Sequence, residues 1–180
     1  MGASCHSLLW AALVASVALP PRPAHLIEGT VVRVEDGDTV TVRLANGTER
    51  VRLTGIDAPE SAESEKLDRD AARSRQSKAT IVALGRRASA YTRRRLQGRR
   101  VGLELDVERR DRYGRLLAYV WLGDTMFNAE MVRDGYADTF TVPPNVRWAE
   151  LFRGLAAEAR TARRGLWADG WTGRPSGRRR

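Results

Sequence analysis

The sequence contains almost no cysteine or histidine. Cys5 is the only cysteine, so the chain can form neither an internal disulfide nor a metal site built from cysteines. His6 and His25 are the only histidines, and both lie at the beginning of the chain. Their position excludes a Ser-His-Asp triad in the body of the protein and argues against a zinc hydrolase. Chemistry there has to use carboxylates, arginines, tyrosines or hydroxyl groups.

Acidic side chains are outnumbered by basic ones. The 180 residues include 31 Lys and Arg against 22 Asp and Glu, which gives a formal net charge of +9. A globular protein this basic attracts polyanions, which means nucleic acid or an anionic membrane surface. Hydrophobic residues make up 42% of the sequence, which is enough for the core of one domain of this length.

Long apolar runs are also missing. The run Leu8–Leu19 is short of the ~20 residues that span a bilayer, and no later segment is more apolar. This run contains the small residues Ser16 and Ala18 near its end, and several prolines follow it. That is the pattern of a signal peptide. We expect residues 1–24 to be a signal peptide and linker, and the protein to be secreted or periplasmic. A leader that is not cleaved would instead anchor the chain in a membrane.

Beyond the leader, short alternating segments predict a β-rich domain. The turn dipeptides Asp36-Gly37 and Asn46-Gly47 separate the first of these segments, as expected for hairpins. Five short strands joined by tight turns are typical of a small closed barrel. The predicted strands are Leu26–Glu35, Thr39–Leu44, Arg50–Ile56, Val101–Val107 and Leu116–Leu122.

Three helices are predicted between and after these strands. They cover Leu84–Leu96, Asn128–Asp134 with Asn128 as N-cap, and an amphipathic segment from Trp148 to Ala162 that ends before Gly165. The order of elements is that of an oligonucleotide/oligosaccharide-binding (OB) barrel. The predicted fold class is therefore α+β, mainly β: a five-stranded OB-fold barrel with three helices, over residues 25–168.

Two polar stretches complete the organisation. Ser61–Ser77 is rich in charge and poor in apolar residues, and we interpret it as a mobile loop beside the site, with a polar helical extension as the alternative. Residues 169–180 end in arginines without an acidic partner near the terminus, and we expect a disordered basic tail.

Three short segments combine carboxylates with arginines. They are Asp36–Thr39, Arg52–Glu60 and Asp111–Arg115, and each alone is also compatible with an ordinary polar turn. Together they supply oxygen ligands for a hard cation of the Ca/Mg/Mn group, because histidine and cysteine are absent there. They also supply a carboxylate base for a water and guanidinium groups that grip phosphate. Those are the parts that attack on a phosphodiester needs.

The same segments resemble the staphylococcal nuclease (thermonuclease) family. The runs GDTV, VRLTGIDAPE and DRYGRLLAYV, and a later segment ending in GLW, carry the resemblance over about Ile27–Trp167. The resemblance implies a five-stranded barrel with three helices. It also implies a Ca²⁺-dependent endonuclease and exonuclease that acts on DNA and RNA and leaves 3′-phosphate products.

By this resemblance, Asp38 and Asp57 would be carboxylate ligands of Ca²⁺, and the main-chain carbonyl of Ala58 would be a third ligand. Ala58 stands where the reference enzyme has threonine, and a main-chain ligand survives that change. The catalytic residues would be Arg52, Glu60 and Arg115.

Three further residues would assist the site. Asp36 would support the metal site from behind, and Tyr113 would lie along the phosphate pocket. Phe140 lies in a segment where the reference enzyme has tyrosines, so it can stack on a base but cannot donate a hydrogen bond to phosphate. The substrate preference is therefore open.

The alternative hypothesis is a non-catalytic OB-fold module that binds nucleic acid by stacking and charge. All five acidic and arginine side chains of the motif are present, which favours the enzyme. We expect DNA and RNA as substrates, a monomer without a stable protein partner, and no membrane contact after leader cleavage.

The first prediction concerns the leader. The mature protein should begin shortly after Ala18, because small residues end the apolar run there. Mass spectrometry of protein recovered from the culture medium measures the new N-terminus. Intact chain recovered in the membrane fraction would support the anchor instead.

Overall fold

The computed structural model describes residues 19–173. The expected signal-peptide run up to Ala18 and the arginine-rich end of the tail, 174–180, lie outside these residues. Within the described part, no helix combines the length and the apolar character needed to cross a membrane.

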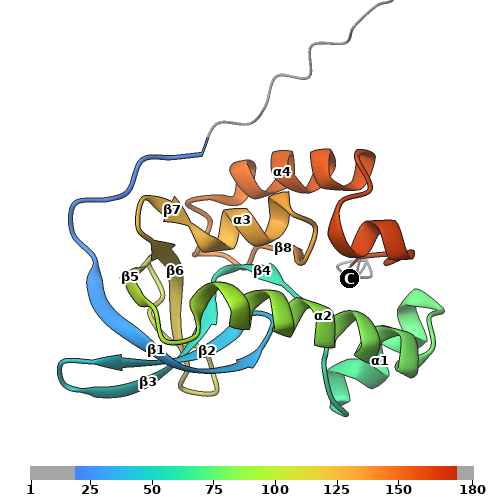
Figure 1. The fold of residues 1–180 in the computed structure, drawn as a ribbon, viewed down its shortest axis with the longest axis horizontal. Helices are drawn as coiled ribbons and strands as arrows, with labels where there is room; N and C mark the ends of the chain where they lie inside the picture. The colour runs from blue at the N-terminus through green and yellow to red at the C-terminus, as the bar shows by residue number, and fades with distance from the viewer. Residues whose placement is uncertain (1–18, 174–180) are drawn as a thin grey trace, which may run out of the picture.

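Five strands form the predicted closed barrel (Figure 1). Antiparallel pairing runs from β3 through β2, β1 and β5 to β6, and a parallel pairing of β3 with β6 closes the circle. Val107, placed in the fourth strand from the sequence, lies beyond β5 and is 71% exposed. The barrel strands are Ile27–Asp36 (β1), Thr39–Leu44 (β2), Gly47–Leu53 (β3), Arg100–Glu104 (β5) and Leu116–Leu122 (β6).

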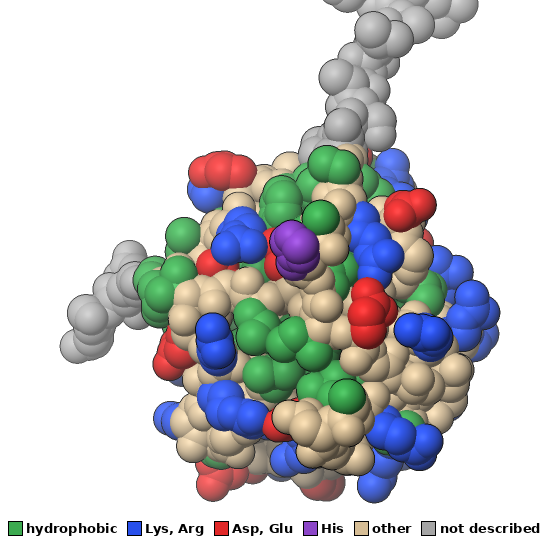
Figure 2. Space-filling model, turned by 90° about the vertical axis from the view of Figure 1, so that its left-hand side faces the viewer, with side chains coloured by type: hydrophobic (Ala, Val, Ile, Leu, Met, Phe, Trp, Pro, Cys, Tyr) green, Lys and Arg blue, Asp and Glu red, His purple; other side chains and the backbone are tan. Residues whose placement is uncertain are grey.

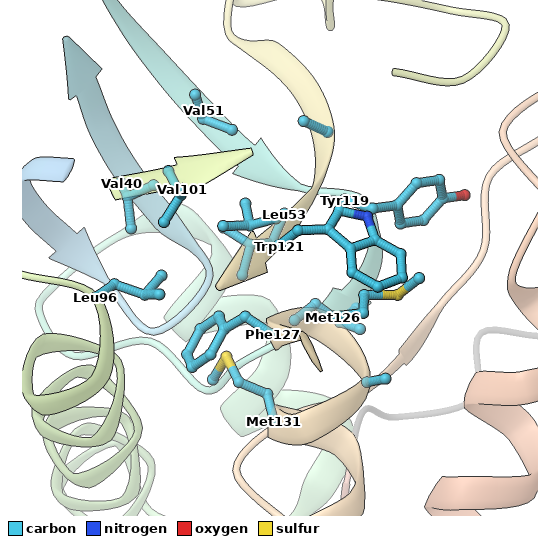
Figure 3. Close-up of a cluster of buried hydrophobic side chains, with 14 of the residues drawn as sticks. Val40, Val51, Leu53, Leu96, Val101, Tyr119, Trp121, Met126, Phe127 and Met131 are labelled. Atoms are coloured by element: carbon cyan, nitrogen blue, oxygen red, sulfur yellow. The ribbon is translucent and has the colours of Figure 1, made fainter. Parts of the chain in front are cut away.

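Alternation along the strands fills the barrel with apolar side chains. Val40 and Val42 of β2 are fully buried, as are Val51 and Leu53 of β3, since successive residues of a strand point to opposite faces. Figure 3 shows Val40, Val51 and Leu53 near the large side chains of β6 and α3, and Val42 belongs to the same cluster. The barrel is therefore a packed core, and the chemistry has to lie at its rim.

Short strands lie outside the barrel: two of them form a separate two-stranded sheet, and another adds to the barrel sheet. The predicted third strand is interrupted at Thr54, so that β3 is followed by a separate strand, Gly55–Asp57 (β4). β4 pairs antiparallel with Asp138–Phe140 (β8), which brings Phe140 opposite Gly55. A two-residue strand, Thr125–Met126 (β7), continues β6 in a hairpin.

The three predicted helices are confirmed, with α2 starting earlier than expected. They are Lys78–Leu96 (α2), Phe127–Arg133 (α3) and Ala149–Thr161 (α4), and a 3₁₀ turn, Gly165–Asp169 (η1), follows α4. α3 packs against α4, and the pair lies at one end of the barrel (Figure 1).

A fourth helix, Glu65–Ser74 (α1), corrects the interpretation of Ser61–Ser77 as a mobile loop. The hydroxyl of Ser64 accepts a hydrogen bond from the Leu67 amide at 3.0 Å and so caps the first turn. Leu67 is fully buried, and α1 lies beside the N-terminal half of α2 (Figure 1). A side-chain cap, one buried leucine and ion pairs such as Lys66 with Glu60 and Lys78 with Asp68 hold this otherwise polar segment in place.

Asn128 does not cap α3, contrary to the prediction. It lies inside the helix, fully buried, and donates from Nδ2 to the Thr54 carbonyl at 2.9 Å. Its Oδ1 accepts from the Val120 amide at 2.8 Å. The side chain thus pairs with one main-chain group where β3 ends and with one in β6, and buried main-chain groups need such partners.

The tail begins later than residue 169. Trp171 is 8% exposed and packs in a second apolar cluster with Ala58, Leu84, Ala88 and Leu166. This cluster holds α2 and η1 against the chain segment that follows β4.

The second prediction concerns Gly85 of α2. A Cβ at this position would lie 2.1 Å from the carbonyl oxygen of Glu60, so the helix backbone and the segment after β4 are in direct contact. Gly85→Ala should lower the free energy of unfolding by about 1–3 kcal/mol through overpacking. In an open helix position the same change would raise it by up to about 1 kcal/mol.

Urea denaturation measures this difference. Ala83→Gly, at an exposed position of the same helix, is the matched control and should lose about 1 kcal/mol from helix propensity alone. A Gly85→Ala variant as stable as the parent would contradict the close packing.

Candidate active site

The β1–β2 turn and the end of β4 bring Asp38 and Asp57 together. Asp38 lies in that turn, and Asp57 is the last residue of β4. The Ala58 amide donates to Oδ2 of Asp38 at 2.8 Å, which ties the turn directly to the segment after β4. Gly37 makes this approach possible, since a Cβ there would lie 2.6 Å from the Cβ of Ala58.

Arg52 bridges the two carboxylates. Its guanidinium lies 3.1 Å from Oδ2 of Asp38 and 2.9 Å from Oδ1 of Asp57. The Arg52 side chain is 12% exposed, so these charge-assisted contacts form with little competing water. The sequence places Arg52 as a phosphate ligand, and in this structure its N–H groups are shared with the acidic residues.

Glu60 lies in the same group of acidic side chains, and we call Asp38, Asp57 and Glu60 the carboxylate cluster. Oε2 of Glu60 accepts a hydrogen bond from the Ser64 hydroxyl at 3.0 Å. The N-terminus of α1 therefore fixes the orientation of Glu60.

Lys66, which sequence reasoning missed, lies at the centre of this cluster. Its Nζ donates to the Ala58 carbonyl at 3.0 Å and lies 2.9 Å from Oε1 of Glu60 and 3.4 Å from Oδ2 of Asp57. Burial alone would lower the pKa of Lys66, but the charges of the carboxylate cluster outweigh it and raise that pKa above its usual range.

Asp36 lies behind the cluster, as expected from the resemblance. It accepts hydrogen bonds from the Gly37 amide at 2.7 Å and the Ser89 hydroxyl at 2.9 Å. Burial raises the pKa of Asp36 to about 6, and the negative charge of Asp38 adds to the rise. These bonds fix the turn that carries Asp38 against α2.

Arg115 and Tyr113 come from the turn before β6. The Arg115 guanidinium is paired with Asp111 at 2.7 Å and lies 5.4 Å from the centre of the Tyr113 ring. Tyr113 is 65% exposed, whereas Phe140 of β8 is partly buried. Neither of these two contacts joins Arg115 to the carboxylate cluster itself.

A groove of about 550 Å³ nevertheless connects the two groups of residues. Its walls include the carboxylate cluster and Arg52 together with Tyr113, Arg115 and Phe140. An adjoining cavity of about 460 Å³ shares the last three and Arg52, and adds apolar side chains such as Ile56 and Val142. Apart from Ala58, the predicted site residues therefore surround one groove, although they come from four separate segments.

The donor set fits a hard cation. The Asp57 carboxylate, the Ala58 carbonyl and the Glu60 carboxylate all face one positive group, the Lys66 ammonium, within 3.4 Å. Such an all-oxygen set suits calcium or magnesium rather than zinc. Among the described residues, no three His, Cys, Asp or Glu side chains are arranged as ligands of one metal ion, so the main-chain carbonyl is an essential member of the set.

Positive charge is not confined to the groove. Figure 2 shows the side of the molecule that lies at the left in Figure 1, away from α1. Lys and Arg side chains surround a small apolar area there, with Asp and Glu side chains among them. Net charge therefore indicates the kind of partner but does not locate the site.

Comparison with known proteins identifies the family. A family model described as "Staphylococcal nuclease homologue" matches residues 50–169. The thermonuclease of Staphylococcus intermedius is 37% identical over 137 residues, which cover 76% of this chain and 74% of that protein. The chain belongs to the staphylococcal nuclease family. The thermonuclease of Staphylococcus hyicus is 32% identical over 139 residues, or 77% of this chain and 75% of that protein. Endonuclease YhcR of Bacillus subtilis is 33% identical over 153 residues, which cover 82% of this chain but 12% of that protein.

The staphylococcal nuclease match begins after the β1–β2 turn. Arg52, Asp57, Glu60 and Arg115 lie inside the matched residues, and Asp38 lies before them. The place of Asp38 beside the others is therefore an observation of the structure, through its contacts with Ala58 and Arg52.

The helix that carries Lys66 had a detectable signal in the sequence. Ser64 followed by Glu65 and Asp68 is the pattern of a capped helix start, with acidic residues in the first turn. The polar helical extension given as the alternative for Ser61–Ser77 is the interpretation that the structure supports. The direction of Lys66 toward the carboxylate cluster would still have required the tertiary structure.

Proposed function

We propose that this protein is a calcium-dependent nuclease that hydrolyses phosphodiester bonds of DNA and RNA to 3′-phosphate products. The observation that carries the proposal is the groove of about 550 Å³. It brings together an all-oxygen donor set, a carboxylate base and two arginines in one place. Membership of a family whose relatives include thermonucleases and an endonuclease supports the same reading.

Calcium would be held by Asp38, Asp57 and the carbonyl of Ala58. When bound, it would supply positive charge that lowers the energy of the charged transition state. Calcium tolerates irregular oxygen sites, whereas magnesium demands near-octahedral geometry and keeps its waters. The proposed donors are a main-chain carbonyl and two carboxylates from different parts of the chain. Such an irregular set suits calcium better than magnesium.

Glu60 would act as the general base. It would take a proton from a water whose oxygen attacks phosphorus, and the bond from phosphorus to the 5′-oxygen would break. The 3′-oxygen keeps the phosphate, and the released 5′-oxygen takes up a proton. The hydrogen bond from Ser64 leaves the second carboxylate oxygen of Glu60, Oε1, facing the cluster.

Arg52 and Arg115 would hold the phosphate and stabilise the charge that builds on its oxygens. Tyr113 and Phe140 would flank the substrate, and the apolar lining of the adjoining cavity offers room for a base. The basic surface would raise the local concentration of polyanionic substrate. We also propose that the protein acts outside the cytoplasm, because the N-terminus carries an apolar run typical of a signal peptide. We propose separately that it acts as a monomer.

The third prediction concerns the metal. Purified mature protein should cleave plasmid DNA and RNA with Ca²⁺, lose cleavage with EDTA, and be supported less well by Mg²⁺. Gel electrophoresis of the products, with 3′-end analysis, measures this. Full cleavage in EDTA would contradict the mechanism, and tight binding of nucleic acid without cleavage under any condition would indicate a binding module.

The fourth prediction separates the roles of Glu60 and Arg115. Glu60→Gln removes the base and should reduce kcat by about 10²–10⁴. Arg115→Ala removes a donor to transition-state charge and should reduce kcat by about 10²–10³. Since both act on one transition state, the losses in the double variant should be less than additive.

Single-turnover cleavage of a labelled oligonucleotide is the measurement, with circular dichroism to verify folding. Arg110→Ala is the matched control for Arg115, because Arg110 lies in the same turn region but pairs with Glu49. This control should keep nearly full activity. A folded Glu60→Gln variant that cleaves within about threefold of the parent would show that Glu60 is not the base.

A further inference from the structure

Four oxygen atoms from different parts of the chain surround the ammonium of Lys66. They belong to the Glu60 carboxylate at 2.9 Å, the Ala58 carbonyl at 3.0 Å, the Asp57 carboxylate at 3.4 Å and the Asp70 carboxylate at 3.6 Å. Two of these groups are proposed calcium ligands, and a third is the proposed base. The helix α1 thus directs its own cation at the donors of the proposed metal site.

We infer that Lys66 is a built-in competitor of the metal: its ammonium occupies the cation position of the carboxylate cluster, and calcium has to displace it. This inference rests on the proposed function. A main-chain carbonyl and a carboxylate that donate their electron pairs to an ammonium are not free to coordinate calcium at the same time. Two cations in this partly buried site would also repel each other.

The choice of residue fits this role. Lys66 and Lys78 are the only lysines in the chain, and all other basic residues apart from histidine are arginine. An ammonium is a compact point charge, whereas a guanidinium is a broad planar fork. The ammonium is therefore the closer substitute for a metal ion that is surrounded by oxygen atoms. Lys78 instead pairs with Asp68 at the surface and is 51% exposed.

The surroundings give the displaced side chain a destination. α1 is held by the Ser64 cap and by buried Leu67, so the ammonium can swing on its four-carbon stem while the helix stays docked. Lys66, Arg69 and Arg73 of α1 all line the groove of about 550 Å³. Calcium binding would therefore move a positive charge toward the surface that substrate phosphates approach. The inhibitory contact would become part of the substrate-binding wall.

The fifth prediction uses the two lysines as probe and internal control. The wild-type mature protein is treated with an amine-acetylating N-hydroxysuccinimide ester, in chelator and in saturating Ca²⁺, and each lysine is quantified by mass spectrometry. Acetylation of Lys66 should accelerate severalfold with Ca²⁺, while that of Lys78 stays unchanged. Isothermal titration calorimetry on the same sample establishes that calcium binds.

Affinity provides the second measurement. Lys66→Met keeps the aliphatic stem but removes the charge, and its Kd for Ca²⁺ should be about tenfold lower than that of wild type. That factor corresponds to an ammonium that holds the position for about nine-tenths of the time. Lys78→Met, the matched charge control, should change the Kd by less than about twofold, because an exposed and more distant charge is screened.

The outcomes separate the two hypotheses. Calcium binding with an unchanged acetylation rate at Lys66 would overturn the competition while leaving the proposed function intact, even if Lys66→Met bound calcium more tightly. That combination would mean that the Lys66 ammonium repels calcium from a distance and does not occupy its position. Absence of calcium binding to both wild type and Lys66→Met would overturn the proposed function and the inference with it.

Discussion

The repulsion between carboxylates brought together at one rim of the barrel is the constraint on which the rest of the site depends. Asp38 comes from the β1–β2 turn and Asp57 from the end of β4, and Glu60 follows three residues after Asp57. Like charges this close in a partly buried setting are costly unless cations offset them. Arg52 and Lys66 supply those cations, each in contact with more than one acidic group. A site of this kind is stable and at the same time ready to exchange one cation for another.

Closure of the barrel explains why both arginines reach the same groove. The parallel pairing of β3 with β6 places Arg52 opposite Leu117, two residues after Arg115. No hairpin could bring these segments together, because about sixty residues separate them in the chain. A parallel pairing requires a long connection, and here that connection contains α1, α2 and β5. The same connection that closes the barrel also supplies Lys66.

Close backbone packing gives the site its rigidity. Gly37 allows the β1–β2 turn to contact Ala58, and Gly85 allows α2 to contact the carbonyl of Glu60. From inside α3, Asn128 bonds one main-chain group at the end of β3 and one in β6. The carboxylates are thus fixed through the backbone that carries them, and the flexible element of the site is the long side chain of Lys66.

The sequence by itself determined the barrel, because alternating apolar residues and turn dipeptides are local patterns whose meaning does not depend on distant contacts. Through the resemblance of three short motifs to the staphylococcal nuclease family, it also indicated which carboxylates and arginines belong together. The tertiary structure decided what those patterns leave open. Leu67 is buried only in the folded molecule, where α1 contacts α2, and Trp171 is part of the domain because it packs with Leu84 and Leu166. The role of Lys66 depends on four oxygen atoms that folding brings together. No local sequence pattern predicts that arrangement.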